Sequence, residues 1–522
     1  SITDIVYLAC SKRILENKKI YPKFATHNAH TISSINYLGQ NCKYEFQRLF
    51  GMGELLYKSA SNILNLEQSP SVYAPIGNYK DLLPYLVRRL LENGANSSFI
   101  NRLLDPETDS KWLAQNPYIR MKSEKKEILL PKNIFGTRLN SSGIDLSEKQ
   151  NLENLSVKLA KFKDKKINAE SIYFGRNKSA DRKFKASSIS SNIDMGTINF
   201  DDPKDIKDCL EKNNSNEWGK IDVKKRTEIL NRVADSIEKD PYELIFYLIN
   251  EAGKTIQNAV DEIREGVDFL RYYAEQALKI IEERELEGPT GEENKILYSP
   301  KGRFLCISPW NFPVAILIGQ ISAALSCGNK VIAKPSEHTS ILGYLVVRKF
   351  HECGVPSSAL ELILGDGLYG DMLTKINSLQ GVAFTGSLPT AKKIQSNLIE
   401  NQNQIVPLIA ETGGINSMLV DSSALLEQVT DDVIRSAFDS AGQRCSALRV
   451  LCIQEEIYEE LVEMIKGNMI TQKIGDPNNF DTDIGPIITK QSIEKLNKYI
   501  DKCREQNFDV FQTTKNTDDM HI

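Results

Sequence analysis

The chain has 522 residues, which is enough for two or three domains with substantial hydrophobic cores. Its net charge is −4, from 65 basic and 69 acidic side chains, which argues against a broadly basic nucleic-acid binder and an acidic disordered chain. Hydrophobic residues make up 41% of the chain and aromatic residues 8%, so disorder is not expected. This composition predicts an ordinary soluble α/β enzyme without a nucleic-acid partner.

The first hundred residues alternate between helical and extended patterns. Helices are expected at residues 1–17, 29–38, 54–64 and 81–92, and strands at residues 20–25, 44–50 and 71–76. Three strand–helix units in a row predict a parallel sheet with helical connections.

Residues 106–200 have a different character, because they are rich in Lys, Asn and Ser and have few long apolar periods. We interpret them as a linker region with short local structure between a domain at 1–105 and a domain at 201–522. In the second domain a long helix is expected at 259–278. Strands are expected at 304–308, 330–334, 362–364, 381–384, 408–410 and 417–420. This alternation predicts a doubly wound α/β fold.

Cysteines, histidines and apolar runs limit the other possibilities. Nine scattered cysteines without CxxC spacing argue against a disulfide framework, and five scattered histidines give no metal motif, so no metal site is expected. The uncharged stretch 304–329 is interrupted by Pro309 and Pro313, and its apolar part has the length of a buried helix. We expect a cytoplasmic protein, with peripheral association at a membrane as a further option.

The helix expected at 81–92 carries a polar face. Tyr85, Arg88, Arg89 and Glu92 have i, i+3, i+4 and i+7 spacing, so they share one side of the helix. Two adjacent arginines can hold a carboxylate, and a tyrosine can close over a small ring. The alternative is a solvated face with an Arg88–Glu92 ion pair, and the pattern alone favours this alternative.

Three motifs in the second domain could support nucleophilic catalysis. Cys445 follows Arg444 in DSAGQRCSALRV, where a neighbouring cation would favour a reactive thiolate, although most free cysteines are small buried side chains. Glu411 follows a short apolar run in LIAETGGIN and is either a general base or a turn residue. Asn311 in ISPWNFP is either an oxyanion donor or a turn residue.

Two further motifs suit a dinucleotide. VIAKPSE ends a strand with Lys334 and Glu337, whose side chains can reach ribose hydroxyls. VAFTGS ends a strand with Gly386 and Ser387 and then opens a helix, whose first N–H groups could bind pyrophosphate. Each motif is weak alone, because the chain has no GxGxxG.

The ordered set PWNFP, KPSE, FTGS, ETGG and GQRCS resembles the aldehyde dehydrogenase superfamily, and residues 251–274 resemble its pyrroline-5-carboxylate dehydrogenase branch. The resemblance implies NAD as the cofactor and glutamate γ-semialdehyde, the hydrolysed form of pyrroline-5-carboxylate, as the substrate. Cys445 would form a thiohemiacetal and then a thioester, and Asn311 with the Cys445 N–H would hold the oxyanion. Glu411 would activate water to release glutamate, and Ser446 would contact the substrate carboxylate.

The segments YPKFATHNAH (21–30), YAPIG (73–77) and YLVRRLLENGANSSFIN (85–101) resemble the proline dehydrogenase domain of the proline utilization A family. That domain is a distorted (β/α)8 barrel that binds FAD. The resemblance implies that Arg88 and Arg89 grip the proline carboxylate. Tyr73, Tyr85 and Leu49 would line the substrate pocket, and Thr26, His27 and Glu92 would contact FAD. The order of the two domains is that of proline utilization A, which converts proline to glutamate.

Only the last three strand–helix units of the barrel have counterparts, and the aldehyde dehydrogenase domain is short at its C-terminal end. We therefore expect an internal fragment of a longer parent, which would have both activities and form a homo-oligomer. The alternative is a non-catalytic remnant that binds NAD or a partner chain.

Overall fold

The computed structural model describes residues 2–66, 69–94, 111, 114–119, 129–176, 181–191, 193–212 and 215–513. The chain divides into two compact units, Ser1–Ile128 and Leu129–Ile522, here called unit 1 and unit 2.

Unit 1 contains a three-stranded parallel sheet in the order β1-β2-β3. Its strands are β1 (Lys23–Ala25), β2 (Glu45–Leu49) and β3 (Ser71–Tyr73), and its helices are α1 (Ile2–Leu15), α2 (Ala29–Leu38), α3 (Glu54–Leu64) and α4 (Tyr79–Gly94). The three strand–helix units are therefore confirmed. A small core joins sheet and helices, and its buried members include Phe24, Ile32, Ile35, Phe46 and Tyr57.

Unit 2 is built on a five-stranded parallel sheet, which confirms the doubly wound fold. The strand order is β11 (Leu360–Leu362), β10 (Lys330–Lys334), β9 (Arg303–Ile307), β12 (Leu379–Gly386) and β13 (Leu408–Thr412). The chain runs outward from β9 to β11 and then returns to β12 on the other side of β9. This reversal creates a switch point between β9 and β12, where ligands bind in open α/β sheets.

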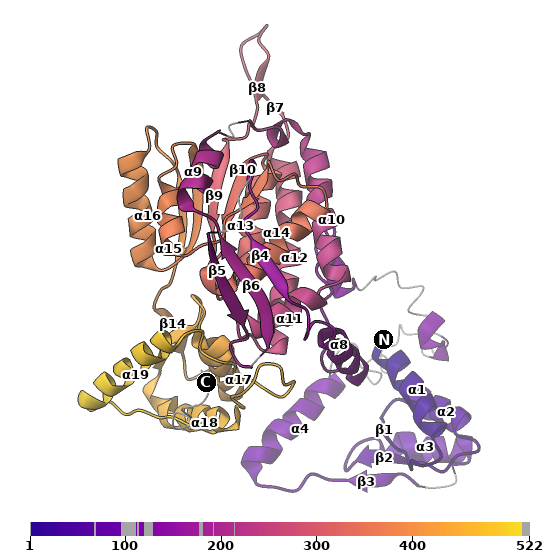
Figure 1. The fold of residues 1–522 in the computed structure, drawn as a ribbon. Coiled ribbons are helices and arrows are strands. Elements are labelled where there is room, and N and C mark those ends of the chain that lie inside the picture. Colours follow the sequence, from indigo (N-terminus) through magenta and orange to yellow (C-terminus); the bar gives the residue numbers. More distant parts are fainter. Residues whose placement is uncertain are drawn as a thin grey trace. The chain divides into compact units, whose positions relative to one another are not determined.

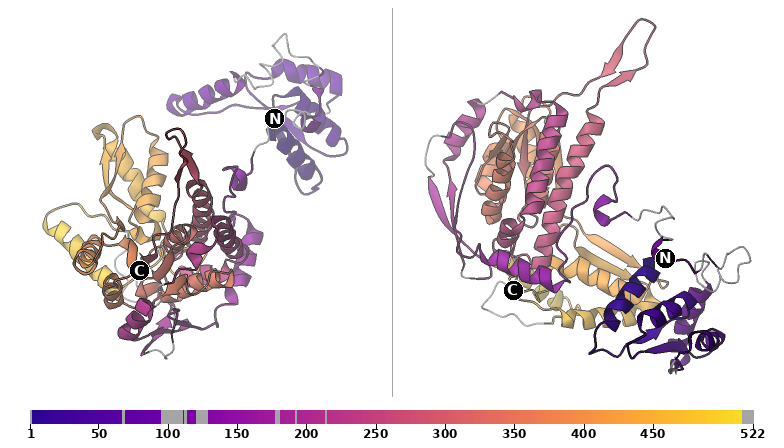
Figure 2. Two further views of the ribbon diagram at one scale, coloured as in Figure 1. Left: turned by 90° about the horizontal axis from the view of Figure 1, so that it is seen from above. Right: turned by 90° about the vertical axis from the view of Figure 1, so that its right-hand side faces the viewer.

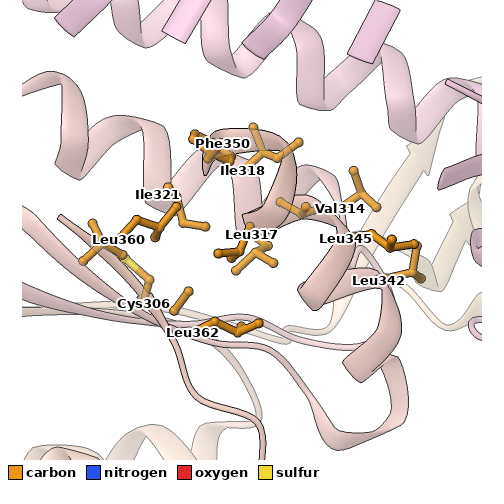
Figure 3. Packing of buried hydrophobic residues seen from close by; sticks show 14 of the residues in the cluster. Cys306, Val314, Leu317, Ile318, Ile321, Leu342, Leu345, Phe350, Leu360 and Leu362 are labelled. Carbon is orange, nitrogen blue, oxygen red and sulfur yellow. The ribbon is translucent and has the colours of Figure 1, made fainter. Parts of the chain in front are cut away.

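Helices cover both faces of this sheet (Figure 1). On one face lie α13 (Ala315–Ser326) and α14 (Ser340–Glu352), and α10 (Val223–Lys239) and α12 (Ile256–Ile280) pack outside them. On the other face lie α15 (Gly367–Thr374) and α16 (Leu388–Asn401). Figure 3 shows how side chains of β9, α13, α14 and β11 fill the space on the first face. None of the helices in the described ranges combines the length and apolar character that a membrane crossing requires.

Residues 149–200 differ from the expected linker. They contain α8 (Lys149–Ala160), β4 (Ile167–Glu170), β5 (Arg182–Ser187) and β6 (Asp194–Phe200), and the strands form a sheet in the order β4-β6-β5. Ile172 also bridges to Leu362 of β11, and Met195 and Phe200 join the main core of unit 2. The sequence hid these strands because they are short and β5 buries only Ala186, so no apolar run is present.

The remaining elements of unit 2 complete its periphery. They are α9 (Pro203–Lys212), α11 (Tyr242–Asn250), β7 (Arg284–Leu286), β8 (Asn294–Ile296), β14 (Asn416–Val420), α17 (Leu426–Phe438), β15 (Leu448–Ile453), α18 (Tyr458–Thr471) and α19 (Lys490–Glu505). β7 and β8 form an antiparallel hairpin that extends away from the sheet of unit 2 (Figure 2). β14 and β15 pair in parallel.

A buried acidic side chain, Glu251, fixes the start of α14. The two oxygens of Glu251 accept hydrogen bonds of 2.8 Å from the backbone N–H groups of Ile341 and Leu342. Such first-turn N–H groups have no partner within their own helix. Burial raises the pKa of Glu251 to about 8, although the two hydrogen bonds act in the opposite direction.

We expect Glu251→Gln to flatten the pH dependence of the free energy of unfolding. Because burial raises the pKa of Glu251 from 4.5 to about 8 on folding, its contribution to stability is full below pH 4.5 and is lost as the pH rises through 8. Between these values, wild-type stability should fall relative to the variant by up to about 1.4 kcal/mol per pH unit. Urea unfolding across this range measures the difference, and parallel pH dependences in the two proteins would contradict the expectation.

Candidate active site

A cavity of about 320 Å³ lies at the switch point of the unit 2 sheet. Its walls come from the segments that follow β9 and β10, from the end of β12, and from α15 and α16. The four residues that the sequence suggested for a dinucleotide all line it: Lys334, Glu337, Gly386 and Ser387. The structure therefore brings together two motifs that are about fifty residues apart in the chain.

Lys334 and Glu337 lie on one side of this cavity. The Lys334 side chain is buried, and its Nζ lies 3.8 Å from Oε2 of Glu337. Burial lowers the pKa of Lys334, and the nearby Glu337 carboxylate partly opposes this effect. The pair presents one cationic and one anionic group to a ligand in the cavity.

The N-terminus of α16 also lines the cavity. Ser387 caps the helix, and its Oγ accepts a hydrogen bond of 3.3 Å from the Thr390 N–H. A Cβ on Gly386 would lie 2.6 Å from Cζ of Phe384, so a side chain there would require Phe384 to move. Pro389 in the first turn has no N–H, so the helix dipole and the Leu388 N–H are what favour an anionic group such as a phosphate here.

Cys445 follows a strained loop. The 3₁₀ turn Asp439–Gly442 contains three successive residues in the left-handed region, Ser440 (φ 53°), Ala441 (φ 55°) and Gly442 (φ 65°). Non-glycine residues in this region cost free energy and persist only when their surroundings hold them there. Cys445 itself is an exposed free cysteine.

Polar contacts from distant segments hold this loop. Arg444 pairs with Asp439 at 2.9 Å and donates to Oδ1 of Asn258, near the start of α12. The Gln443 side chain donates to the Pro486 carbonyl at 3.1 Å and accepts from the Ile488 N–H at 3.0 Å. The loop is therefore tied to two segments that lie far from it in sequence.

Asn311 contacts the same loop. Its Nδ2 donates a hydrogen bond of 2.9 Å to the backbone carbonyl of Gln443, two residues before Cys445. Its Oδ1 is buried and has no hydrogen-bond partner in the described part of the chain. Because an amide NH2 has two donors, one remains for a ligand oxygen.

Glu411 lies near the end of β13, opposite Thr385 of β12, and its side chain is exposed. Five residues later Asn416 begins β14, and its Nδ2 donates to the Cys445 carbonyl at 2.7 Å. The segment that carries Glu411 is thus joined through Asn416 to the segment that carries Cys445. Ser446, next to the cysteine, is exposed.

Four of the five proposed substrate residues of unit 1 (Leu49, Tyr73, Tyr85 and Arg89) are linked by contacts where its parallel strands end. Leu49 and Tyr73 are register partners at the ends of β2 and β3. Burial raises the pKa of Tyr73, and interaction with Tyr85 of α4 raises it further. The Arg89 guanidinium carbon lies 5.4 Å from the centroid of the Tyr85 ring, whereas Arg88 is exposed.

The residues suggested for a flavin follow β1. Burial lowers the pKa of His27, and its Nε2 is a buried atom without a hydrogen-bond partner among the described residues. The Thr26 Oγ1 accepts from the Asn28 N–H at 3.1 Å. The side chain of Glu92 lies outside the described residues.

Sequence reasoning gave no role to the side chains that tie the site together, namely Asn258, Asn416 and Gln443. Asn416 and Gln443 lie within LIAETGGIN and DSAGQRC, so the motifs pointed to their neighbourhood. Asn258 is 181 residues from Asp439, to which it donates at 2.7 Å, and no local pattern reveals such a contact.

We expect Gly442→Ala to destabilise unit 2 by roughly 1–3 kcal/mol. The new Cβ would lie 2.7 Å from the Ala437 carbonyl oxygen, at a residue with φ of +65°. A matched control is Gly467→Ala in α18, where a Cβ meets no heavy atom within 4 Å. The control should gain about 0.5–1 kcal/mol from the helix preference of alanine. Urea unfolding measures the stability of both variants. A Gly442→Ala protein as stable as the wild type would contradict the requirement for glycine in this loop.

Comparison with known proteins identifies two family segments. The aldehyde dehydrogenase family model matches residues 177–520, and the proline dehydrogenase model matches residues 1–102. The bifunctional protein PutA of Salmonella typhimurium is 40% identical over 555 residues, which cover 99% of this chain and 40% of that protein. The chain thus spans well under half the length of this relative.

Solved structures agree with these matches. A Bradyrhizobium japonicum proline utilization A (PutA) variant superposes with a TM-score of 0.82 at 38% identity, covering 96% of this chain and 49% of that chain. A Thermus 1-pyrroline-5-carboxylate dehydrogenase with bound NAD has a TM-score of 0.69 at 25% identity, covering 73% of this chain and 76% of that chain. The chain belongs to the aldehyde dehydrogenase family and joins to that domain a proline dehydrogenase segment, in the arrangement of the bifunctional PutA proteins.

Proposed function

We propose that the native polypeptide oxidises glutamate γ-semialdehyde to glutamate with NAD, as a step of proline catabolism. One observation supports this most strongly: Lys334, Glu337, Gly386 and Ser387 line a single cavity at the sheet switch point. In the same unit, Asn311 is hydrogen-bonded to the loop of Cys445. The similarity to a 1-pyrroline-5-carboxylate dehydrogenase with bound NAD supports the same assignment.

The cavity fits NAD by its chemistry. The start of α16 offers its dipole and the Leu388 N–H to a pyrophosphate, and Lys334 and Glu337 offer a donor and an acceptor to ribose hydroxyls. Gly367 and Gly370 of α15 also line the cavity, and a Cβ on either would meet only open space. NAD bound there supplies the two-electron acceptor that oxidation of an aldehyde requires.

The residues around Cys445 account for the remaining chemistry. The thiolate of Cys445 attacks the aldehyde carbon and forms a thiohemiacetal. The free N–H of the Asn311 amide and the Cys445 backbone N–H stabilise the negative charge on the former carbonyl oxygen. After oxidation to the thioester, Glu411 removes a proton from a water molecule that attacks the acyl carbon and releases glutamate. Ser446 contacts the substrate carboxylate.

We also propose that the native polypeptide oxidises proline with FAD. Arg88, Arg89, Tyr73, Tyr85 and Leu49 form the substrate side of this site. Thr26, His27 and Glu92 form the flavin side, and the buried His27 Nε2 without a protein partner supports a ligand contact there. FAD supplies the acceptor for the hydride that proline loses.

Small molecules are the partners that this function requires: proline, pyrroline-5-carboxylate and its semialdehyde. We further propose a homo-oligomer in the cytoplasm or at the membrane surface. All nine cysteines are free, which supports a reducing compartment. Light scattering of the native polypeptide tests the oligomer.

We expect Cys445→Ser to lower NADH formation from the semialdehyde by at least about 10³-fold in the native polypeptide, because the hydroxyl is a much weaker nucleophile. Glu411→Gln should give a burst of about one NADH per site followed by slow turnover, because thioester hydrolysis loses its base. Stopped-flow absorbance measures both. Cys452→Ser is the matched control, since Cys452 is also exposed and lies on β15. It should turn over like the wild type.

The same assay distinguishes the proposed dehydrogenase from the alternative, a non-catalytic remnant that binds NAD or a partner chain. If the native polypeptide binds NAD in a titration but an intact Cys445 gives no NADH, the proposed activity is wrong and the remnant describes the protein better.

A further inference from the structure

A buried ion pair contacts the turn that carries Asn311 and, through the Phe312 ring, is connected to the loop that carries Cys445. The Lys254 Nζ lies 2.8 Å from Oε2 of Glu262, and the two side chains are 4% and 0% exposed. Glu262 lies on α12, and Lys254 lies just before that helix. The mechanism proposed for Cys445, Asn311 and Glu411 uses neither of them.

The carboxylate of Glu262 fixes the end of the Asn311 turn. Its Oε1 accepts hydrogen bonds from the backbone N–H groups of Val314 at 2.8 Å and Ala315 at 3.2 Å. Val314 is the N-cap of α13 and Ala315 is its first residue, and they come three and four residues after Asn311. The carboxylate therefore holds the point at which the turn enters the helix, where N–H groups lack partners in their own helix.

The ammonium of Lys254 reaches the other half of the site through an aromatic ring. Its Nζ lies 4.1 Å from the centroid of the Phe312 ring, next to Asn311. The guanidinium carbon of Arg444, next to Cys445, lies 5.6 Å from the same centroid. Cations within about 6 Å of a ring are attracted by its quadrupole. Two cations, Lys254 and Arg444, therefore lie near the Phe312 ring.

Stability alone is a weak reason for such a pair. Removing two charges from water can cost as much as their attraction returns, so apolar replacements of buried pairs are often tolerated. The contacts of this pair are instead directional. The carboxylate accepts hydrogen bonds from two backbone N–H groups, and the ammonium makes a cation–π contact with one ring. These contacts fix geometry at the Asn311 turn and, through Phe312, at the Cys445 loop.

We propose that Lys254 and Glu262 form a positioning unit, which fixes the position of the Asn311 amide relative to the Cys445 loop. The kinetic consequence rests on the proposed aldehyde oxidation, whereas the contacts themselves do not. The two can therefore be tested separately.

Hydrogen exchange tests the positioning in the full chain without NAD or aldehyde. In Lys254→Met, exchange in peptides that cover 310–316 and 439–447 should be at least about tenfold faster, because the released carboxylate and ring no longer hold them. Lys254→Arg should stay close to the wild type. Arg176→Met is the matched control, since it breaks another pair of low exposure, Arg176–Asp201 at 2.7 Å. This control should leave both peptides unchanged.

Steady-state kinetics of the native polypeptide test the consequence. In Lys254→Met, kcat should fall about 10- to 100-fold, because small displacements of reacting groups have effects of this size. The KM for NAD should change much less than kcat, since Lys254, Glu262 and Phe312 are not among the residues that line the cofactor cavity. If Lys254→Met does not fold, Phe312→Leu keeps the ion pair, removes the ring and should show the same division between kcat and KM.

Unchanged exchange in both peptides of a folded Lys254→Met protein would overturn the positioning unit. An equal change in Arg176→Met would also overturn it, because the effect would then be general destabilisation. If the wild type forms no NADH but exchange responds as expected, the positioning unit is supported and the aldehyde oxidation is wrong.

Discussion

Buried acidic side chains at helix N-termini fix the two connections on which the site of unit 2 depends. Glu251 accepts from the first turn of α14, and Glu262 accepts from the start of α13. α13 follows the turn of Asn311, and α14 follows Glu337, so each acid sets the end of a loop that carries a proposed ligand contact. One short segment before and within α12 therefore controls both loops, since unsatisfied first-turn N–H groups demand an acceptor.

In the loop before Cys445, side-chain contacts hold the backbone in a conformation that its residues disfavour. Ser440 and Ala441 have positive φ values that their side chains disfavour. The Asp439–Arg444 pair and the contacts of Asn258 and Gln443 hold them in place. The geometry at the sulfur is thus a property of the folded unit and depends on residues nearly two hundred positions away.

The difference between local patterns and long-range contacts explains which features the sequence could predict and which it could not. β10 was predicted with its observed bounds because all five of its residues are buried and read as one apolar strand between two lysines. Lys334 and Gly386 end strands, and Glu337 and Ser387 come shortly after those ends, so their meeting at the carboxyl ends of the sheet followed from the fold. The strands between 149 and 200 lacked such a run, and Asn258, Gln443 and Asn416 act through long-range contacts that no local period records.

The helix α4 shows how the structure distinguishes residues that a pattern treats alike. The spacing of Tyr85, Arg88 and Arg89 gave them one face and favoured a solvated surface. In unit 1, however, Arg89 packs near the Tyr85 ring, Tyr85 interacts with Tyr73, and Arg88 is exposed. A carboxylate arriving at this face would meet one guanidinium that is already oriented and one that must be ordered on binding. Because ordering a long side chain costs entropy, Arg89 is the better preorganised of the two for a bidentate contact.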